Sequence, residues 1–168
     1  CAETSLPVSM GPSDQRPNEY RPDVLVYSSD VLESDVEVTG PVKLVLYASS
    51  SAKDTDFSAK LVDVFPDGYA MNVAQGIQRA RYRDSWEKPA LMTPGDVYKF
   101  EIDLWSTSNC FLKGHRIRVE VTSSNFPQFD RNPNTGNDFG QDAEIVKADQ
   151  TILHDNDHPS HIILPIID

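Results

Sequence analysis

The residues with the richest chemistry lie in one continuous stretch, SSNFPQFDRNPNTG, from Ser123 to Gly136. It combines two aromatic rings, one Asp–Arg pair and three asparagines, with almost no aliphatic side chain. Such residues suit a cation site of oxygen ligands, a ligand site with aromatic walls, or a contact that fixes the loop to neighbouring structure. The side chains that carry these alternatives are Phe126, Phe129, Asp130, Arg131 and Asn132.

Calcium binding is one alternative, because oxygen-bearing side chains recur along residues 130–142. The pattern is not that of an EF-hand, since glycine stands at the seventh position rather than the sixth, and Gln141, at the twelfth, is no bidentate carboxylate. A cation site of another geometry stays open, as does sugar binding on exposed aromatic rings. The oxygen ligands would be Asp130, Asn132, Asn134, Asp138 and Asp142, and the further rings Trp86 and Trp105.

Nucleophilic catalysis within this chain is not expected. The sequence contains no G-x-S-x-G elbow, which an α/β-hydrolase uses to present its serine. The tail HDNDHPSH holds His154, His158 and His161, but its proline and the strand that follows favour a polar turn over a metal site. His115 begins a strand, where we expect it to cap loop backbone. We therefore predict no catalytic residue, no cofactor and no bound metal.

A row of arginines is the second feature of interest. The segment IQRARYR, residues 77–83, alternates as a strand does and would place Arg79, Arg81 and Arg83 on one face. In a chain of net charge −11 such a basic row has two interpretations. It is either a solvated face whose arginines pair with neighbouring carboxylates, or a docking face for an acidic partner surface.

Composition limits the classes of function. The 168 residues suffice for one domain, and the net charge of −11 argues against nucleic-acid binding, which needs clustered Lys and Arg. No run approaches the ~18 apolar residues of a membrane span. The start lacks both Met and the apolar centre of a signal peptide, so we expect a fragment of a longer chain and assign no compartment. Cys110 is expected to be a small buried hydrophobe, with a reactive thiol or a bridge to Cys1 as alternatives.

The elements that must position these residues are strands. Apolar segments rich in β-branched and aromatic residues follow one another, with almost no helical periodicity apart from a possible turn near 71–76. Turn residues separate them: Pro-Asp-Gly at 66–68, Thr-Pro-Gly-Asp at 93–96 and Lys-Gly at 113–114. The strand segments are 23–29, 36–50, 56–66, 77–83, 96–108, 115–124, 144–154 and 161–168.

The strand faces predict the fold class. In VYKFEIDLW the residues from Tyr98 to Leu104 alternate between apolar and charged, and in HRIRVEV the apolar residues point inward while Glu120 points outward. Eight or so strands without intervening helices predict an all-β fold, a jelly-roll β-sandwich similar to galactose-binding domains. We assign residues 1–22 to an extended lead-in that tucks against other structure, and 23–168 to the sandwich.

Several longer motifs carry a resemblance to a known family. They are R-P-D-V-L-V-Y, V-T-G-P-V, D-T-D-F-x-A-K-L-V-D-V-x-P-D-G, G-H-R-I-R and S-S-N-F-P-x-F-D-R-N, spread from about Asp14 to Leu164. With them the chain resembles the C-terminal domain of the X-Pro dipeptidyl-peptidase and cocaine esterase family of serine hydrolases. α-Amino-acid ester hydrolases and glutaryl acylase-like enzymes belong to the same group.

The resemblance implies a parent chain with an α/β-hydrolase domain that carries a Ser-Asp-His triad, a helical cap, and this jelly roll as a non-catalytic domain. The expected partners are the hydrolase and cap domains of the same chain, with a homo-oligomer as a further possibility. The parent's substrate is left open among peptides, esters and β-lactam side chains. A carbohydrate- or calcium-binding jelly-roll module is the alternative function.

In this interpretation the Ser123–Gly136 loop is a lock, either within the sandwich or at the hydrolase interface. Its two rings would bury apolar area, and Asp130 with Arg131 would hold charge-assisted hydrogen bonds. Phe126→Ala or Arg131→Ala should then lower the melting temperature of the isolated domain by several degrees.

Overall fold

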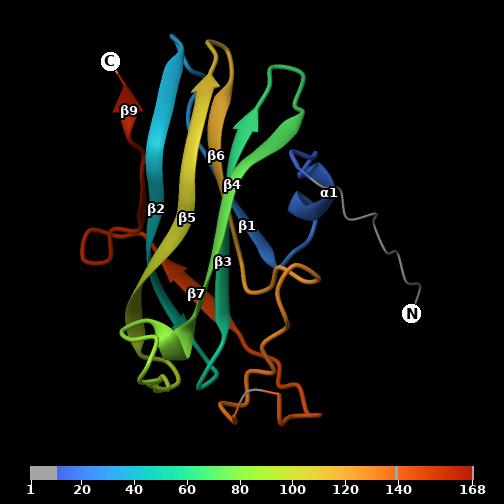
Figure 1. Cartoon of the computed structure of the whole chain (residues 1–168), viewed down its shortest axis with the longest axis vertical. Coiled ribbons are helices and arrows are strands. Elements are labelled where there is room, and N and C mark those ends of the chain that lie inside the picture. Colours follow the sequence, from blue (N-terminus) through green and yellow to red (C-terminus); the bar gives the residue numbers. More distant parts are fainter. Residues whose placement is uncertain (1–10, 139, 168) are drawn as a thin grey trace.

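The computed structural model describes residues 11–138 and 140–167, which form two antiparallel sheets (Figure 1). The first sheet has the order β1 (Val24–Ser28), β6 (Arg116–Thr122), β3 (Asp56–Val64) and β4 (Ala70–Arg79). In the second sheet β2 (Val36–Ser50) pairs with β5 (Val97–Phe111) on one edge, and on the other with β7 (Gln150–Leu153), β8 (His161–Ile163) and β9 (Ile166–Ile167). The predicted β-sandwich is confirmed, and its jelly-roll connectivity stays a prediction.

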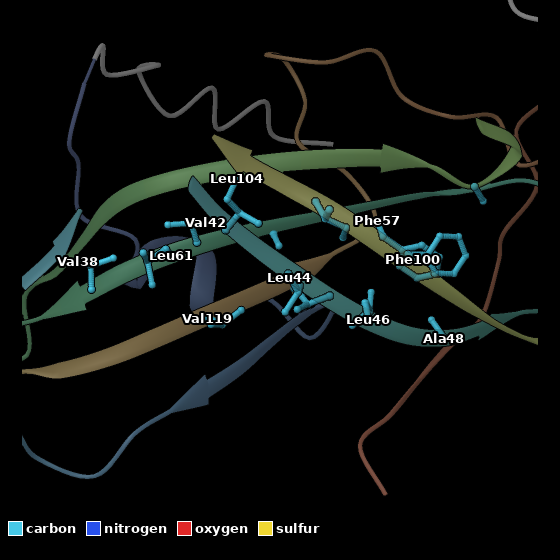
Figure 2. Packing of buried hydrophobic residues seen from close by; sticks show 14 of the residues in the cluster. Val38, Val42, Leu44, Leu46, Ala48, Phe57, Leu61, Phe100, Leu104 and Val119 are labelled. Atoms are coloured by element: carbon cyan, nitrogen blue, oxygen red, sulfur yellow. The ribbon is translucent and has the colours of Figure 1, made fainter. Parts of the chain in front are cut away.

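The core lies between the two sheets (Figure 2). Period-two alternation in β5 turns Phe100, Ile102 and Leu104 inward, where all three are fully buried, and leaves the charged residues between them exposed. The ring of Phe100 meets that of Phe57 from β3 at 4.7 Å between centroids, so the two sheets interlock through aromatic contact. Each such side chain contributes about 1.5–3 kcal/mol by leaving water.

Glycine is required at the turns and at one close approach. Gly68, Gly95 and Gly114 have φ of 85°, 88° and 89°, which confirms the three turns expected from the sequence. In β4, a Cβ on Gly76 would lie 2.0 Å from the carbonyl oxygen of Asp103 in β5. The backbones of β4 and β5 therefore touch, and they close one side of the sandwich.

Two local predictions about residues 71–83 were wrong. The expected helical turn near 71–76 is the middle of β4, because pairing with β3 outweighs the weak local helical preference. The expected strand over 77–83 ends at Arg79, and a 3-10 turn follows over Ala80–Tyr82. Its partner β3 begins at Asp56, opposite Arg79, so no strand remains to pair with the later residues.

Three side chains lie in other surroundings than the sequence suggested. Cys110 is exposed, because the buried neighbour in the alternation is Phe111; Cys1 lies outside the described residues. Glu120 does point away from the core, as its alternation with Val119 and Val121 predicts, but it is buried because the lead-in covers that face of the sheet. His115 is buried too, and its Nδ1 meets the carboxylate of Asp63 at 2.8 Å instead of capping loop backbone.

The described part of the lead-in is not fully extended. It contains the one-turn helix α1 (Arg16–Glu19) and lies against the first sheet (Figure 1). The backbone N–H of Gln15 donates to the carbonyl oxygen of Ala70 at 2.8 Å, and Asp14 bridges to Met71 in β4. The division at residue 22 stays a prediction. No helix in the described part of the chain has the length and apolar character needed to cross a membrane.

Candidate functional site

The structure brings the loop after β6 to two of the predicted arginines. The side-chain amide of Asn132 donates one hydrogen bond to Oδ2 of Asp54 at 3.0 Å and another to Oδ1 of Asp56 at 2.9 Å. Both aspartates are buried, one just before β3 and one at its first residue. The loop is thus tied to the end of the first sheet by an amide that reaches two carboxylates.

Arg79 and Arg81 neutralise the same two carboxylates. Arg79 forms a forked pair with Asp56, with Nε to Oδ1 at 2.9 Å and Nη2 to Oδ2 at 3.1 Å. This pairing raises the pKa of the Arg79 guanidinium above its ordinary value. Arg81 donates from its backbone N–H and from Nε to the two oxygens of Asp54, at 2.9 and 2.7 Å. We call Asp54, Asp56, Arg79, Arg81 and Asn132 the loop clamp.

The clamp also holds the far end of the loop. Arg81 Nη2 donates to the carbonyl oxygen of Asn137 at 2.8 Å. Arg83 lies apart from it, because the strand has ended. Its Nη1 donates to the carbonyl oxygens of Ala80 and Ala90, and its guanidinium lies 4.4 Å from the ring centre of Tyr98. The three arginines therefore do not form a row on one strand face, and the first two pair with buried carboxylates.

The loop's two rings are only partly covered by the residues that the structure describes. Phe126 is 57% exposed and Phe129 is 38% exposed. The guanidinium of Arg131 lies over the Phe126 ring, 4.4 Å from its centre. Asp130 makes no side-chain hydrogen bond within the residues that the structure describes. Burial inside the sandwich is therefore ruled out for Phe126, and its role at an interface stays a prediction.

A cleft of about 270 Å³ is lined by clamp residues, among them Asp54 and Arg81, and by loop residues from Asp130 to Asp142. Asn134 donates to the carbonyl oxygen of Val146 at 2.8 Å, so its amide serves the loop's own backbone. Thr135 and Asn137 donate to the carboxylate of Asp142 and hold its pKa below the ordinary value. Among residues 11–138 and 140–167, no group of three or more His, Cys, Asp or Glu side chains is arranged to hold a metal.

The histidine-rich tail does not converge on one point either. The ring of His154 packs edge-on against Tyr27, with centroids 5.9 Å apart. His158 Nδ1 lies 3.1 Å from Asp155, and His161 Nδ1 contacts the carbonyl oxygen of Pro159.

The residues that sequence reasoning missed are the two acceptors of the clamp. Asp54 and Asp56 appear in the motif D-T-D-F without an assigned role. A signal was available, since two acids two residues apart at the start of a buried strand point to one face and need cationic partners. The described lining of the cleft contains no serine, cysteine or histidine. The contacts of the clamp hold the loop after β6 against the first sheet.

Several known proteins are similar to this chain in sequence and structure. Cocaine esterase from Rhodococcus sp. (strain MB1 Bresler) is 54% identical over 159 residues, which are 94% of this chain and 28% of the esterase. An aminopeptidase from a marine sediment archaeon, Thaumarchaeota archaeon, superposes with a TM-score of 0.88 at 35% identity, covering 92% of this chain and 27% of that one. An α-amino acid ester hydrolase gives a TM-score of 0.87 at the same identity and coverage.

The chain thus spans less than a third of the length of these relatives. A CocE/NonD family hydrolase from Staphylococcus aureus shares the fold, with a TM-score of 0.71 at 18% identity. A family model described as the X-Pro dipeptidyl-peptidase C-terminal non-catalytic domain matches residues 2–163. The chain belongs to this family of non-catalytic C-terminal domains.

Proposed function

We propose that this domain packs against the α/β-hydrolase domain of a serine hydrolase that cleaves acyl ester or peptide bonds. It stabilises that enzyme without taking part in the chemical step. The named relatives support this proposal, since they are an esterase, an ester hydrolase and an aminopeptidase of which this chain matches about a quarter. The match to a family of non-catalytic C-terminal domains supports a role outside the chemical step.

The observation that carries the proposal is the exposed apolar surface of β1. Leu25, Val26 and Tyr27 are consecutive and all exposed, so both faces of this strand present apolar side chains. Among the described strands β1 pairs with β6 alone and forms the edge of its sheet. Edge strands that face water normally carry charged residues or proline, which prevent pairing with other strands. An apolar edge strand therefore indicates a surface that another domain or protein covers.

The loop after β6 extends this surface. Val24 pairs with Thr122, so the start of β1 lies beside the start of the loop (Figure 1). One cleft of about 280 Å³ includes Phe126 and Ile145 from the loop together with Arg21, which precedes β1. We call Leu25, Val26, Tyr27, Phe126 and Ile145 the β1–loop surface. The clamp fixes the loop before docking, which reduces the entropy lost on contact.

Substitution on this surface tests the proposal in the full-length hydrolase. Leu25→Asp should lower its melting temperature by about 3 °C or more, because a charge would enter the covered surface. The same change in the 168-residue chain should have little effect, since Leu25 is 42% exposed there. Val97→Asp is the matched control, being 40% exposed on β5, which adjoins β4 at the opposite end of the first sheet. Equal melting temperatures for the two full-length variants would refute the proposal.

A second test asks whether the 168-residue chain has hydrolase activity of its own. The 168-residue chain should hydrolyse neither 4-nitrophenyl acetate nor an Xaa-Pro 4-nitroanilide above the buffer rate. Turnover that a single substitution abolishes would contradict a purely mechanical role.

A further inference from the structure

Arg131 differs from the other arginines that the structure describes. Arg116 donates to the carbonyl oxygen of Ser29. Arg131 contacts the Phe126 ring and has no hydrogen-bonding or carboxylate partner within the described residues. The N–H donors of its planar guanidinium are therefore available to a ligand or partner. The arginines paired with carboxylates are Arg16, Arg21, Arg79, Arg81, Arg83 and Arg118.

The surroundings of Arg131 favour an anion. It lines the cleft of about 280 Å³ that also contains Phe126 and Ile145, and the described lining holds no acidic side chain. The second cation there, Arg21, is already held by Asp23 at 2.9 and 2.5 Å. Arg131 also lines the neighbouring cleft of about 270 Å³, whose lining includes Asp54 and Asp130, but no carboxylate of the described residues forms an ion pair with its guanidinium.

Docking of the β1–loop surface would remove the Arg131 guanidinium from water. The guanidinium lies 4.4 Å from the centre of the Phe126 ring, so a partner that covers the ring also covers the charge. A charge that leaves water without a counter-ion is strongly destabilising. A stable interface therefore has to supply an anion at this point, and a carboxylate matches the planar fork of the guanidinium with two parallel hydrogen bonds.

We propose that an Asp or Glu side chain of the adjoining hydrolase domain enters the cleft beside Phe126 and pairs with the guanidinium of Arg131. This inference rests on the proposed function, and it adds the chemistry of the partner surface. The apolar residues supply area, whereas the carboxylate fixes the orientation of the two domains.

The experiment compares three variants in the full-length hydrolase and in the 168-residue chain. Arg131→Gln should lower the melting temperature of the full-length protein by about 3 °C or more, and Arg131→Lys by less, because lysine keeps the charge and loses the fork. In the 168-residue chain both should lie within about 2 °C of the wild type, since exposed cation–π contacts are weak. Arg16→Gln is the matched control, because Arg16 has its own partner in Asp14 within this chain.

The outcomes separate the inference from the proposed function. If Leu25→Asp destabilises the full-length protein while Arg131→Gln behaves as Arg16→Gln does, the carboxylate is absent and the inference is overturned. If neither Leu25→Asp nor Arg131→Gln has an effect, the proposed function fails as well.

Two further results decide the source of the carboxylate. Arg131→Glu should lower the melting temperature of the full-length protein, and one Asp→Arg or Glu→Arg change in the hydrolase domain should restore it. Saturable binding of benzoate to the 168-residue chain that Arg131→Gln abolishes would assign the cleft to a free carboxylate, and would overturn the protein-derived one.

Discussion

Two clusters of buried charge lie on the first sheet, and they are built differently. The loop clamp, at the start of β3 and the end of β4, matches its two buried carboxylates with two guanidinium groups and an amide. The second cluster lies under α1 at the centre of the sheet. It consists of Gln15, Glu19, Lys60, Arg118 and Glu120, which we call the α1 cluster.

The α1 cluster has two acids and two cations, but one of its acids lacks a hydrogen-bond donor. Arg118 Nη1 donates to both oxygens of Glu19, at 2.8 and 2.7 Å, and Lys60 Nζ donates to the side-chain oxygen of Gln15 at 2.7 Å. Glu120, 3% exposed, is left with an Oε1 that has no hydrogen-bond partner. Burial raises the pKa of Glu120 from 4.5 to about 7; Lys60 opposes this change and Glu19 adds to it.

The difference shows that burial alone does not decide how a charged group behaves. Arginine donors and an amide satisfy the carboxylates of the clamp, so hydrogen bonds compensate for their loss of water. Glu120 lacks such donors and is held in a site that favours its neutral form. The clamp should therefore fail when a partner is removed, whereas the α1 cluster should respond to pH.

The largest effect is expected from removing Arg81. Arg81→Met would leave the buried carboxylate of Asp54 without its cation and should lower the free energy of unfolding by about 3–5 kcal/mol. Urea unfolding of the 168-residue chain measures it. Lys43→Met is the matched control, because it breaks a pair with Glu101 in which both side chains are about half exposed, and it should cost less than ~1 kcal/mol. Similar losses in the two variants would show that the clamp is only a surface ion pair.

The next effect is the pH dependence of the α1 cluster. Folded Glu120 binds its proton more tightly than the unfolded chain does, so stability should fall as pH rises from 4.5 to about 7. Glu120→Gln should remove this slope and raise stability at pH 8 by on the order of 2–3 kcal/mol. Chemical denaturation at a series of pH values measures both quantities.

A matched control for Glu120 is the exposed Glu101, whose pKa is lowered by Lys99 and Lys43. Glu101→Gln should leave the loss of stability between pH 4.5 and 7 in place. If the dependence of stability on pH is the same in Glu120→Gln as in the wild type, other groups cause it. The α1 cluster would then not differ from the clamp in its response to pH.

The smallest effect is expected for Phe126→Ala in the 168-residue chain. The ring is 57% exposed, and the Arg131 guanidinium lies over it in a cation–π contact. The loss should be less than ~1 kcal/mol, which is smaller than the several degrees that full burial predicts. Thermal melts of the chain check this value. A drop as large as that of Arg81→Met would mean that the ring, rather than the clamp, holds the loop.

The sequence determined the fold class because the relevant signals are local. Alternation from Tyr98 to Leu104 gave the inner face of β5, and a glycine with positive φ stands at each predicted turn, as at Gly68. The motifs between Asp14 and Leu164 also gave the family. Each of these features depends on residues that are neighbours in the chain.

Tertiary structure alone decided which residues meet. Asn132 reaches Asp54 across 78 positions of sequence, and Arg118 reaches Glu19 across 99. Strand alternation states which side of the sheet a residue such as Glu120 faces, but not that α1 covers this side and buries it. Local patterns fix the direction of a side chain, whereas its solvation and its partners depend on distant segments that the fold brings alongside.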